Sequence, residues 1–184
     1  MTIREAQQEM REVFIDGAAG SFVSSALWLA SAALATWGSR TQAMVTLVLG
    51  GVLIFPITLR VLRLIGRSAT VRKENPLSFL AMQVAFTIPL AIPLVLAATA
   101  HKAEWFYAGL LIVVGAHYLP FVTLYGLPIY AVAGGLMVAA GIVLPSQRPG
   151  DFTAGGWLGG ALLALLGVAL AAGHAARARA AHSP

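Results

Sequence analysis

The 184-residue chain is 59% hydrophobic and only 10% charged, whereas a water-soluble domain carries about 25% charged residues, so the composition excludes a soluble globular protein. The chain is also too apolar for a disordered protein, and its mean hydropathy of +0.82 indicates an integral membrane protein. The net charge of +5 would favour nucleic acid as the partner of a soluble protein, but here the basic residues separate apolar segments and mark membrane topology, so no nucleic-acid partner is expected.

Residues 1–17 are predicted to form a short amphipathic leader on the cytoplasmic side. Ile3, Met10, Val13 and Phe14 recur at the spacing of one helical face, and the positions between them are rich in glutamate. The segment lacks the basic start of a secretory signal, so cleavage is not expected. An acidic polar face is a poor anchor for anionic lipid, so we expect the leader to dock on the chain's own basic second loop.

Six apolar stretches follow between residues 18 and 173. A membrane-spanning helix needs about 20 residues, and most of the stretches reach or nearly reach this length. The fourth reaches spanning length only if Tyr118 and Leu119 extend it, because Pro120 and the turn residues after it are expected to break the helix. The region 105–144 is therefore either two helices with a tight turn, which we favour, or one long broken span. The predicted spans are Ala18–Gly38, Gln42–Ile65, Leu77–Ala100, Trp105–His117, Leu127–Leu144 and Phe152–Gly173.

The Lys and Arg residues favour six spans with both termini in the cytoplasm, since basic residues accumulate on cytoplasmic loops. This topology leaves three basic residues outside, Arg40, Lys102 and Arg148, and nine inside. A single span over 105–144 would give eight inside against four outside. The sequence thus predicts an all-α bundle of six transmembrane helices in a lipid bilayer, followed by a basic cytoplasmic tail over residues 174–184. The nine inside are Arg4, Arg11, Arg60, Arg63, Arg67, Arg72, Lys73, Arg177 and Arg179.

The third span carries the first group of candidate binding residues. Pro89 and Pro93 each remove a backbone donor, and Gln83 and Thr87 lie one turn apart beside the carbonyls that this frees. Freed carbonyls next to an amide resemble the discontinuous helices that bind ions or small polar solutes in transporters. The alternative, which we favour, is a proline kink whose carbonyls are satisfied within the bundle.

A polar-aromatic group surrounds the turn between the fourth and fifth spans, and it consists of His117, Tyr118, Tyr125 and Tyr130. The favoured interpretation is an interfacial belt with rings in lipid and hydroxyls in water. The alternative is a pH-sensitive or ligand-contacting cluster, since histidine titrates near neutrality. The spacing of these residues does not separate the two interpretations.

No catalytic residue, metal site or cofactor is predicted. The spans contain no Asp, Glu or Lys at mid-depth, and His117 is the histidine that lies near a span. A nucleophile–base pair and a bis-histidine haem therefore cannot be assembled, and zinc or iron sites lack ligands. The absence of cysteine also excludes disulfides, iron–sulfur clusters and thiolate nucleophiles.

The inner loop is predicted to hold the chain against the membrane. Anionic lipid attracts basic residues at about 1 kcal/mol each near the surface, and the glutamates of the leader offer a competing partner. The expected anchoring residues are Arg60, Arg63, Arg67, Arg72 and Lys73.

The last span contains two overlapping Gly-xxx-Gly pairs, which let helix backbones approach closely. We expect them to form the interface of a homodimer, and the alternative is packing within the bundle. These glycines are Gly155, Gly156, Gly159 and Gly160.

Four short strings are arranged as in a family of small bacterial membrane proteins. They are Gly50–Pro56, Asn75–Leu77, Glu104–Phe106 and Thr123–Gly126. Across about residues 15–141 the chain resembles this uncharacterised family, a domain of unknown function. The resemblance implies a polytopic protein of the bacterial inner membrane and implies no activity, substrate or cofactor. The position before Tyr118 tends to be arginine in that family, and the histidine found here departs from the pattern.

Two function classes follow from these observations. The leading hypothesis is a small transport or channel-like protein for a small solute or ion, with a cavity among the kinked second, third and fifth spans. The alternative is a non-catalytic membrane scaffold or accessory subunit whose small-residue faces bind partner helices. An enzyme acting on lipid ranks third, because the sequence supplies too few acid–base groups.

Overall fold

The computed structural model describes residues 1–180, which form helices and contain no strand. Six helical segments are long and apolar enough to cross a membrane. Two of them combine neighbouring elements of the structure: α1, η1 and α2 form one, and α4 and α5 form another. The predicted class, an all-α bundle of six such helices with a helical leader, is therefore confirmed. The elements are α1 (Ile3–Phe14), the 3-10 turn η1 (Ile15–Gly17), α2 (Ala18–Trp37), α3 (Arg40–Leu64), α4 (Leu77–Ala85), α5 (Thr87–His101), α6 (Trp105–Tyr125), α7 (Ile129–Gln147) and α8 (Ala154–Ala180).

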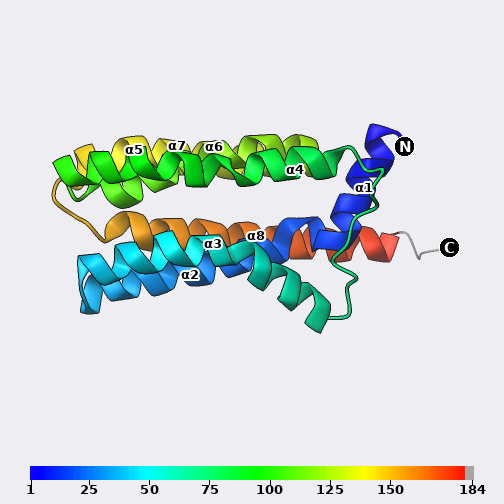
Figure 1. The fold of residues 1–184 in the computed structure, drawn as a ribbon, viewed down its shortest axis with the longest axis horizontal. Helices are drawn as coiled ribbons and strands as arrows, with labels where there is room; N and C mark the ends of the chain where they lie inside the picture. The colour runs from blue at the N-terminus through cyan, green and yellow to red at the C-terminus, as the bar shows by residue number, and fades with distance from the viewer. Residues whose placement is uncertain (181–184) are drawn as a thin grey trace.

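The helices form two layers that lie side by side (Figure 1). One layer contains α2, α3 and α8, and the other contains α4, α5, α6 and α7. The most extensive contacts lie within the layers, where α6 packs on α7 and α2 packs on both α8 and α3. Contacts of α8 with α6 and α7 join the two layers.

Both ends of the described chain lie at the same end of the bundle, where α1 crosses from one layer to the other (Figure 1). We call this the leader end. Six long helices, an even number, return the described chain to the end of the bundle at which it began, as the sequence predicts. Helix α8 continues beyond the predicted span into the basic tail and ends at Ala180; the last four residues of that tail, 181–184, lie outside the described residues.

The expected break at Pro120 is wrong. Helix α6 runs through this proline and ends after 21 residues at Tyr125, where Gly126 adopts a left-handed φ of 66°. A proline removes one backbone hydrogen bond, and here the close packing of α6 on its neighbours holds the helix together. The favoured alternative of two helices with a tight turn is confirmed, since α7 begins three residues after Gly126.

Small and hydroxylated residues let the helices of one layer approach each other. Ser25 donates a hydrogen bond to the carbonyl of Gly160 on α8 at 2.8 Å. Ser31 donates to the carbonyl of Ala43 on α3 at 2.8 Å and shares a hydrogen bond of 2.6 Å with the Tyr107 hydroxyl. These interhelical bonds satisfy polar groups that would otherwise be costly inside an apolar bundle.

The glycine face of α8 packs inside the chain. All four glycines of the two overlapping pairs are buried, and a Cβ on Gly156 would lie 2.9 Å from the Tyr107 ring and 3.0 Å from the Cβ of Ala32. Gly159 and Gly160 lie in the same way against Trp28 and Leu29 of α2. The surface predicted as a dimer interface is therefore covered within one chain.

Adding a methyl group to this face is expected to destabilise the fold. Gly156→Ala forces the Tyr107 ring and Ala32 apart, and overpacking of this kind costs about 1–3 kcal/mol. The matched control is Gly51→Ala, because a Cβ there meets nothing within 4 Å and alanine favours the helix. Thermal unfolding in detergent measures both; equal midpoints for the two variants would contradict the packing described here.

Candidate functional site

The leader ends in a strained turn. Ile15, Asp16 and Gly17 have φ values of 52°, 55° and 88°, a left-handed conformation that residues other than glycine rarely adopt. Position 17 also requires glycine for space, since a Cβ there would collide with the hydroxyl of Tyr130. The turn leaves the side chain of Asp16 fully buried where α2 begins.

The buried carboxylate of Asp16 is paired with two side chains of α8. Its Oδ2 atom accepts a hydrogen bond from the guanidinium of Arg177 and lies 3.5 Å from Nδ1 of His174. The backbone carbonyl of Asp16 accepts a hydrogen bond of 2.5 Å from the Tyr130 hydroxyl. An ionised carboxylate is tolerated in a bundle only when it is paired. These four residues, which we call the carboxylate centre, therefore join the starts of α2 and α7 to the end of α8.

The pairing of Asp16 with His174 and Arg177 is not predicted from the sequence. Asp16 lies two residues before the first predicted span, and His174 and Arg177 lie just beyond the last one, so all three were assigned to the leader and the tail. The signal that could have found them is the continuation of the last helix, which places a histidine and an arginine three residues apart on one face.

The prediction of an interfacial belt is wrong for its three tyrosines, which lie inside the bundle. Tyr130 belongs to the carboxylate centre, and the other two tyrosines pack close to it. Tyr118, Tyr125 and Tyr130 are buried, and the Tyr130 ring stacks on Tyr125 at 5.4 Å between centroids and lies 5.7 Å from Tyr118. The Phe121 ring packs against all three. The rings lie between helices rather than in lipid, because α7 folds back directly on α6 and covers them.

The structure brings two of the predicted binding residues together at a helix break. Helices α4 and α5 are interrupted at Phe86, where the Thr87 hydroxyl donates to the carbonyl of Val84 at 2.7 Å and lies 2.8 Å from Nδ1 of His117 on α6. Gln83 is exposed and has no hydrogen bond to either residue.

The second, third and fifth predicted spans do not pack around one shared cavity. In the structure α3 packs on α2 in one layer, whereas α5 and α7 both pack on α6 in the other. The kinked helices are thus separated by the layer arrangement, which the sequence alone does not define.

The leader is attached to the inner loop by Glu9. Its Oε1 atom accepts hydrogen bonds from the backbone and the Nε of Arg72 at 2.9 and 3.1 Å, and its Oε2 atom accepts from the Asn75 amide at 2.8 Å. The Asn75 amide also donates to the carbonyl of Ala6. Partial burial would raise the pKa of Glu9, but the hydrogen bonds from Arg72 and Asn75 outweigh it and hold the pKa below its usual value.

The leader also caps α6. Gln7 donates to the carbonyl of Thr123 at 2.8 Å, and Arg11 donates to the carbonyl of Tyr125 at 2.6 Å. The last carbonyls of a helix have no intrahelical partner and carry partial negative charge, so an amide and a guanidinium stabilise them.

The five predicted anchoring residues divide into two groups. Arg72 is bound to Glu9, and Arg67 donates to the carbonyl of Glu12 at 3.4 Å. Arg60, Arg63 and Lys73 are exposed. The loop is thus partly held by the leader, as expected, and two arginines of α3 remain available to the surroundings.

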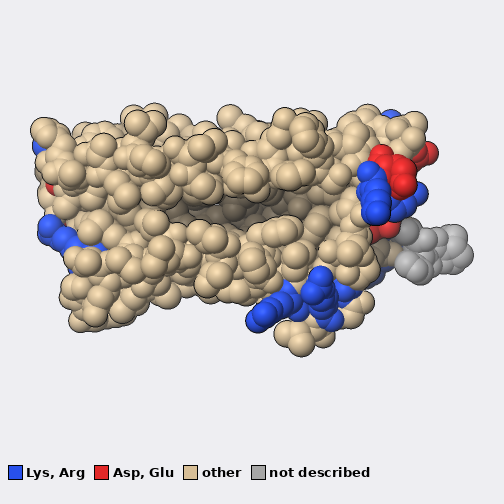
Figure 2. Space-filling model, in the orientation of Figure 1, with Lys and Arg blue, Asp and Glu red and all other residues tan. Residues whose placement is uncertain are grey.

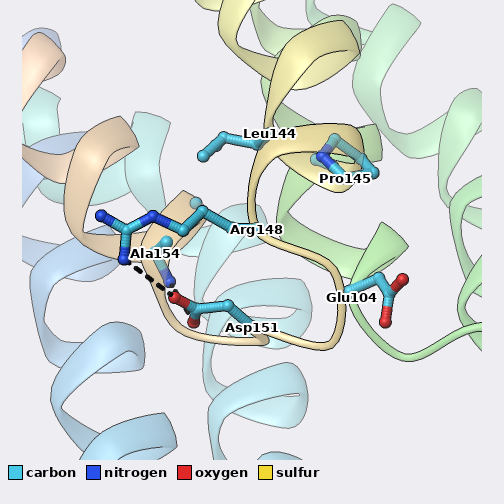
Figure 3. Close-up of a pocket in the computed structure, with 8 residues that line it drawn as sticks. Glu104, Leu144, Pro145, Arg148, Asp151 and Ala154 are labelled. Atoms are coloured by element: carbon cyan, nitrogen blue, oxygen red, sulfur yellow. Dashed lines mark hydrogen bonds and ion pairs between the residues drawn. The ribbon is translucent and has the colours of Figure 1, made fainter.

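The opposite end of the bundle contains a small pocket between the starts of α6 and α8 and the end of α7 (Figure 3). Arg148 and Asp151 point toward each other across it, with 4.0 Å between Nη1 and Oδ2. Asp151 Oδ1 accepts from the backbone of Thr153 and Ala154 and so caps α8. The cavity volume is about 10 Å³, which leaves room for no more than about one water molecule.

Among residues 1–180, no three His, Cys, Asp or Glu side chains are close enough to hold a metal ion. The family of unknown function DUF7010 matches residues 3–172 of the chain. No curated protein and no solved structure matches it.

Removing the charge of Arg177 is expected to destabilise the leader end. Arg177→Gln leaves the buried carboxylate of Asp16 with the His174 contact alone, and a buried acceptor that loses such a partner costs about 1–3 kcal/mol. Arg179→Gln, which removes an exposed charge from the same helix, is the matched control. Thermal unfolding in detergent compares the two variants; similar midpoints would show that the pair contributes little.

The attachment of the leader by Glu9 is expected to depend on pH. Because the folded state lowers the pKa of Glu9, the contact is fully stabilising above the ordinary value of 4.5 and is lost as the pH falls through the lowered value. Spin labels on Gln8→Cys and Thr70→Cys should therefore move apart between neutral pH and about pH 3. A Glu9→Gln background should show a separation that no longer changes with pH. An unchanged distance in both backgrounds would contradict a role for this carboxylate.

Proposed function

We propose that this chain, which belongs to the DUF7010 family of unknown function, is a non-catalytic membrane scaffold or accessory subunit. The observation that carries the proposal is the closure of the bundle at both of its ends. Buried aromatic rings occupy both ends of the space between the helices, with Trp28, Phe106 and Tyr107 at one end and Tyr118, Tyr125 and Tyr130 at the other. A solute would have to displace these side chains to cross within one chain.

The polar residues expected to bind a solute support the same conclusion. Thr87 and His117 satisfy each other and the carbonyl of Val84, and Gln83 lies on the surface. These hydrogen bonds hold α5 against α6, and binding a solute at this point would require breaking them.

The outer face of α7 is the surface on which we expect a partner helix. Ala131, Gly135 and Ala139 recur at every fourth position and are all exposed, and a Cβ on Gly135 meets nothing within 4 Å. Small residues at this spacing let a second helix approach closely in lipid. A homodimer of this chain would use this open face, because the glycines of α8 are already covered.

We also propose that the leader end faces the cytoplasm of a bacterial cell. Nine basic residues belong to segments at this end and three to the opposite end, and basic residues accumulate on the cytoplasmic side of the inner membrane.

Transport of a small ion or solute is the second candidate, and the break between α4 and α5 favours it. A helix interrupted within its apolar span beside a histidine resembles the ion-binding helices of transporters. This function would require the break to open toward water in another conformation or between two copies of the chain.

The scaffold proposal is tested on α7. Gly135→Leu should reduce crosslinked dimers or partner complexes in native membranes while leaving the unfolding midpoint unchanged, because the added side chain meets no atom of its own chain. The matched control is Gly51→Leu on α3, also open to the surroundings. Equal crosslinking in both variants and the parent chain would exclude this face.

The same purified chain tests transport. Reconstituted liposomes that contain ion-sensitive dyes should show no flux above protein-free vesicles. A flux that disappears in Thr87→Val would favour the transport candidate and overturn the scaffold proposal.

A further inference from the structure

One face of α3 points away from the helix on which α3 packs. Its inward positions Leu47, Thr58 and Leu62 are buried. On the opposite side a row of exposed residues follows the helical spacing along the whole element, and we call it the α3 stripe. It consists of Val45, Leu49, Val52, Pro56, Arg60 and Arg63.

The first two thirds of the α3 stripe are apolar. Val45, Leu49 and Val52 are 49%, 64% and 70% exposed, and the extensive contacts of α3 are with α2. From residue 45 to residue 60 the stripe extends roughly 22 Å along the helix. This length exceeds the about 15 Å of one hydrocarbon leaflet.

The leader end of the α3 stripe carries two guanidinium groups. Arg60 and Arg63 are exposed and have no hydrogen bond or ion pair among the described residues, in contrast to Arg67 and Arg72, which bind the leader. The segment from Arg40 to Lys73 contains no Asp or Glu. Helix α3 therefore contains no acidic residue that could neutralise this charge.

The shape of the molecule leaves space beside these arginines. The last turns of α3, beyond Pro56, diverge from the bundle (Figure 1). Figure 2 shows a hollow between the two layers, with Lys and Arg side chains over the nearby end of α3.

We propose that the α3 stripe is a binding site for an anionic phospholipid of the surrounding bilayer. The phosphate binds Arg60 and Arg63, whose planar guanidinium groups match phosphate oxygens in pairs. One acyl chain lies along Val52, Leu49 and Val45. The site is independent of the scaffold and transport proposals, because it uses neither α7 nor the break between α4 and α5.

Charge and position favour a lipid over a segment of this chain. The glutamates of the leader are already engaged, since Glu9 is bound to Arg72, Glu5 to the backbone of Thr2 and Glu12 to the amide of Gln8. A phospholipid combines the negative group and the apolar chain in the order in which the stripe presents their partners, whereas a free anion would leave the apolar part uncovered.

Native mass spectrometry of the purified full chain tests the site, with phosphatidylglycerol and phosphatidylcholine of identical acyl chains as probes. The parent chain should retain phosphatidylglycerol in preference to phosphatidylcholine. Arg60→Gln/Arg63→Gln should weaken phosphatidylglycerol binding by roughly fivefold for each arginine removed. The matched control is Arg4→Gln/Lys73→Gln, which removes the same charge from exposed positions at the same end.

Retention of phosphatidylglycerol by the control, together with its loss in the α3 variant, supports a defined site. Equal loss in the two variants would show diffuse attraction to basic surface and would overturn the proposal. No preference for phosphatidylglycerol in the parent chain would overturn it as well. Equal thermal midpoints of the two variants exclude unfolding as the cause of a difference.

Discussion

The carboxylate of Asp16 is buried at the point where the leader becomes the first long helix, and an unpaired charge there would be too costly to keep. Arg177 and His174 of the last helix make this burial tolerable, and the hydroxyl of Tyr130 donates to the backbone carbonyl of the same aspartate. These contacts join α8 and the start of α7 to the start of α2. Helices α2 and α8 are thereby joined to one another at the leader end of the bundle.

The leader extends this closure to the other layer. Through Arg11 and Gln7 it caps the end of α6, and through Glu9 it holds the loop that leads to α4. Its apolar face covers helix ends while its polar face makes an ion pair with Arg72, so a short segment adds to the contacts that join the two layers. An amphipathic helix placed in this way acts as a structural part of the bundle.

The distribution of polar groups explains why a packed protein results. Serine hydroxyls on α2, the Thr87 hydroxyl and His117 each find a partner on a neighbouring turn or helix. In an apolar solvent such bonds are retained because the alternative is an unsatisfied group. Two arginines of α3 and the open face of α7 are left facing outward, and interactions with lipid or other chains are therefore expected at those surfaces.

The sequence by itself determined the class of the protein, because apolar stretch lengths and the positions of basic residues depend only on local composition. The helix count, the helical leader and its docking on the basic loop followed from it.

The tertiary structure alone decided the rest. Tyr118, Tyr125 and Tyr130 could lie in lipid or in a core, and the return of α7 along α6 buried them. Gly156 could pack within the chain or between chains, and the ring of Tyr107 covers it. Asp16 and Arg177 are separated by most of the sequence, and only the folding of α8 beside α2 brings them together, since pairing between distant residues leaves no periodic signal in the chain.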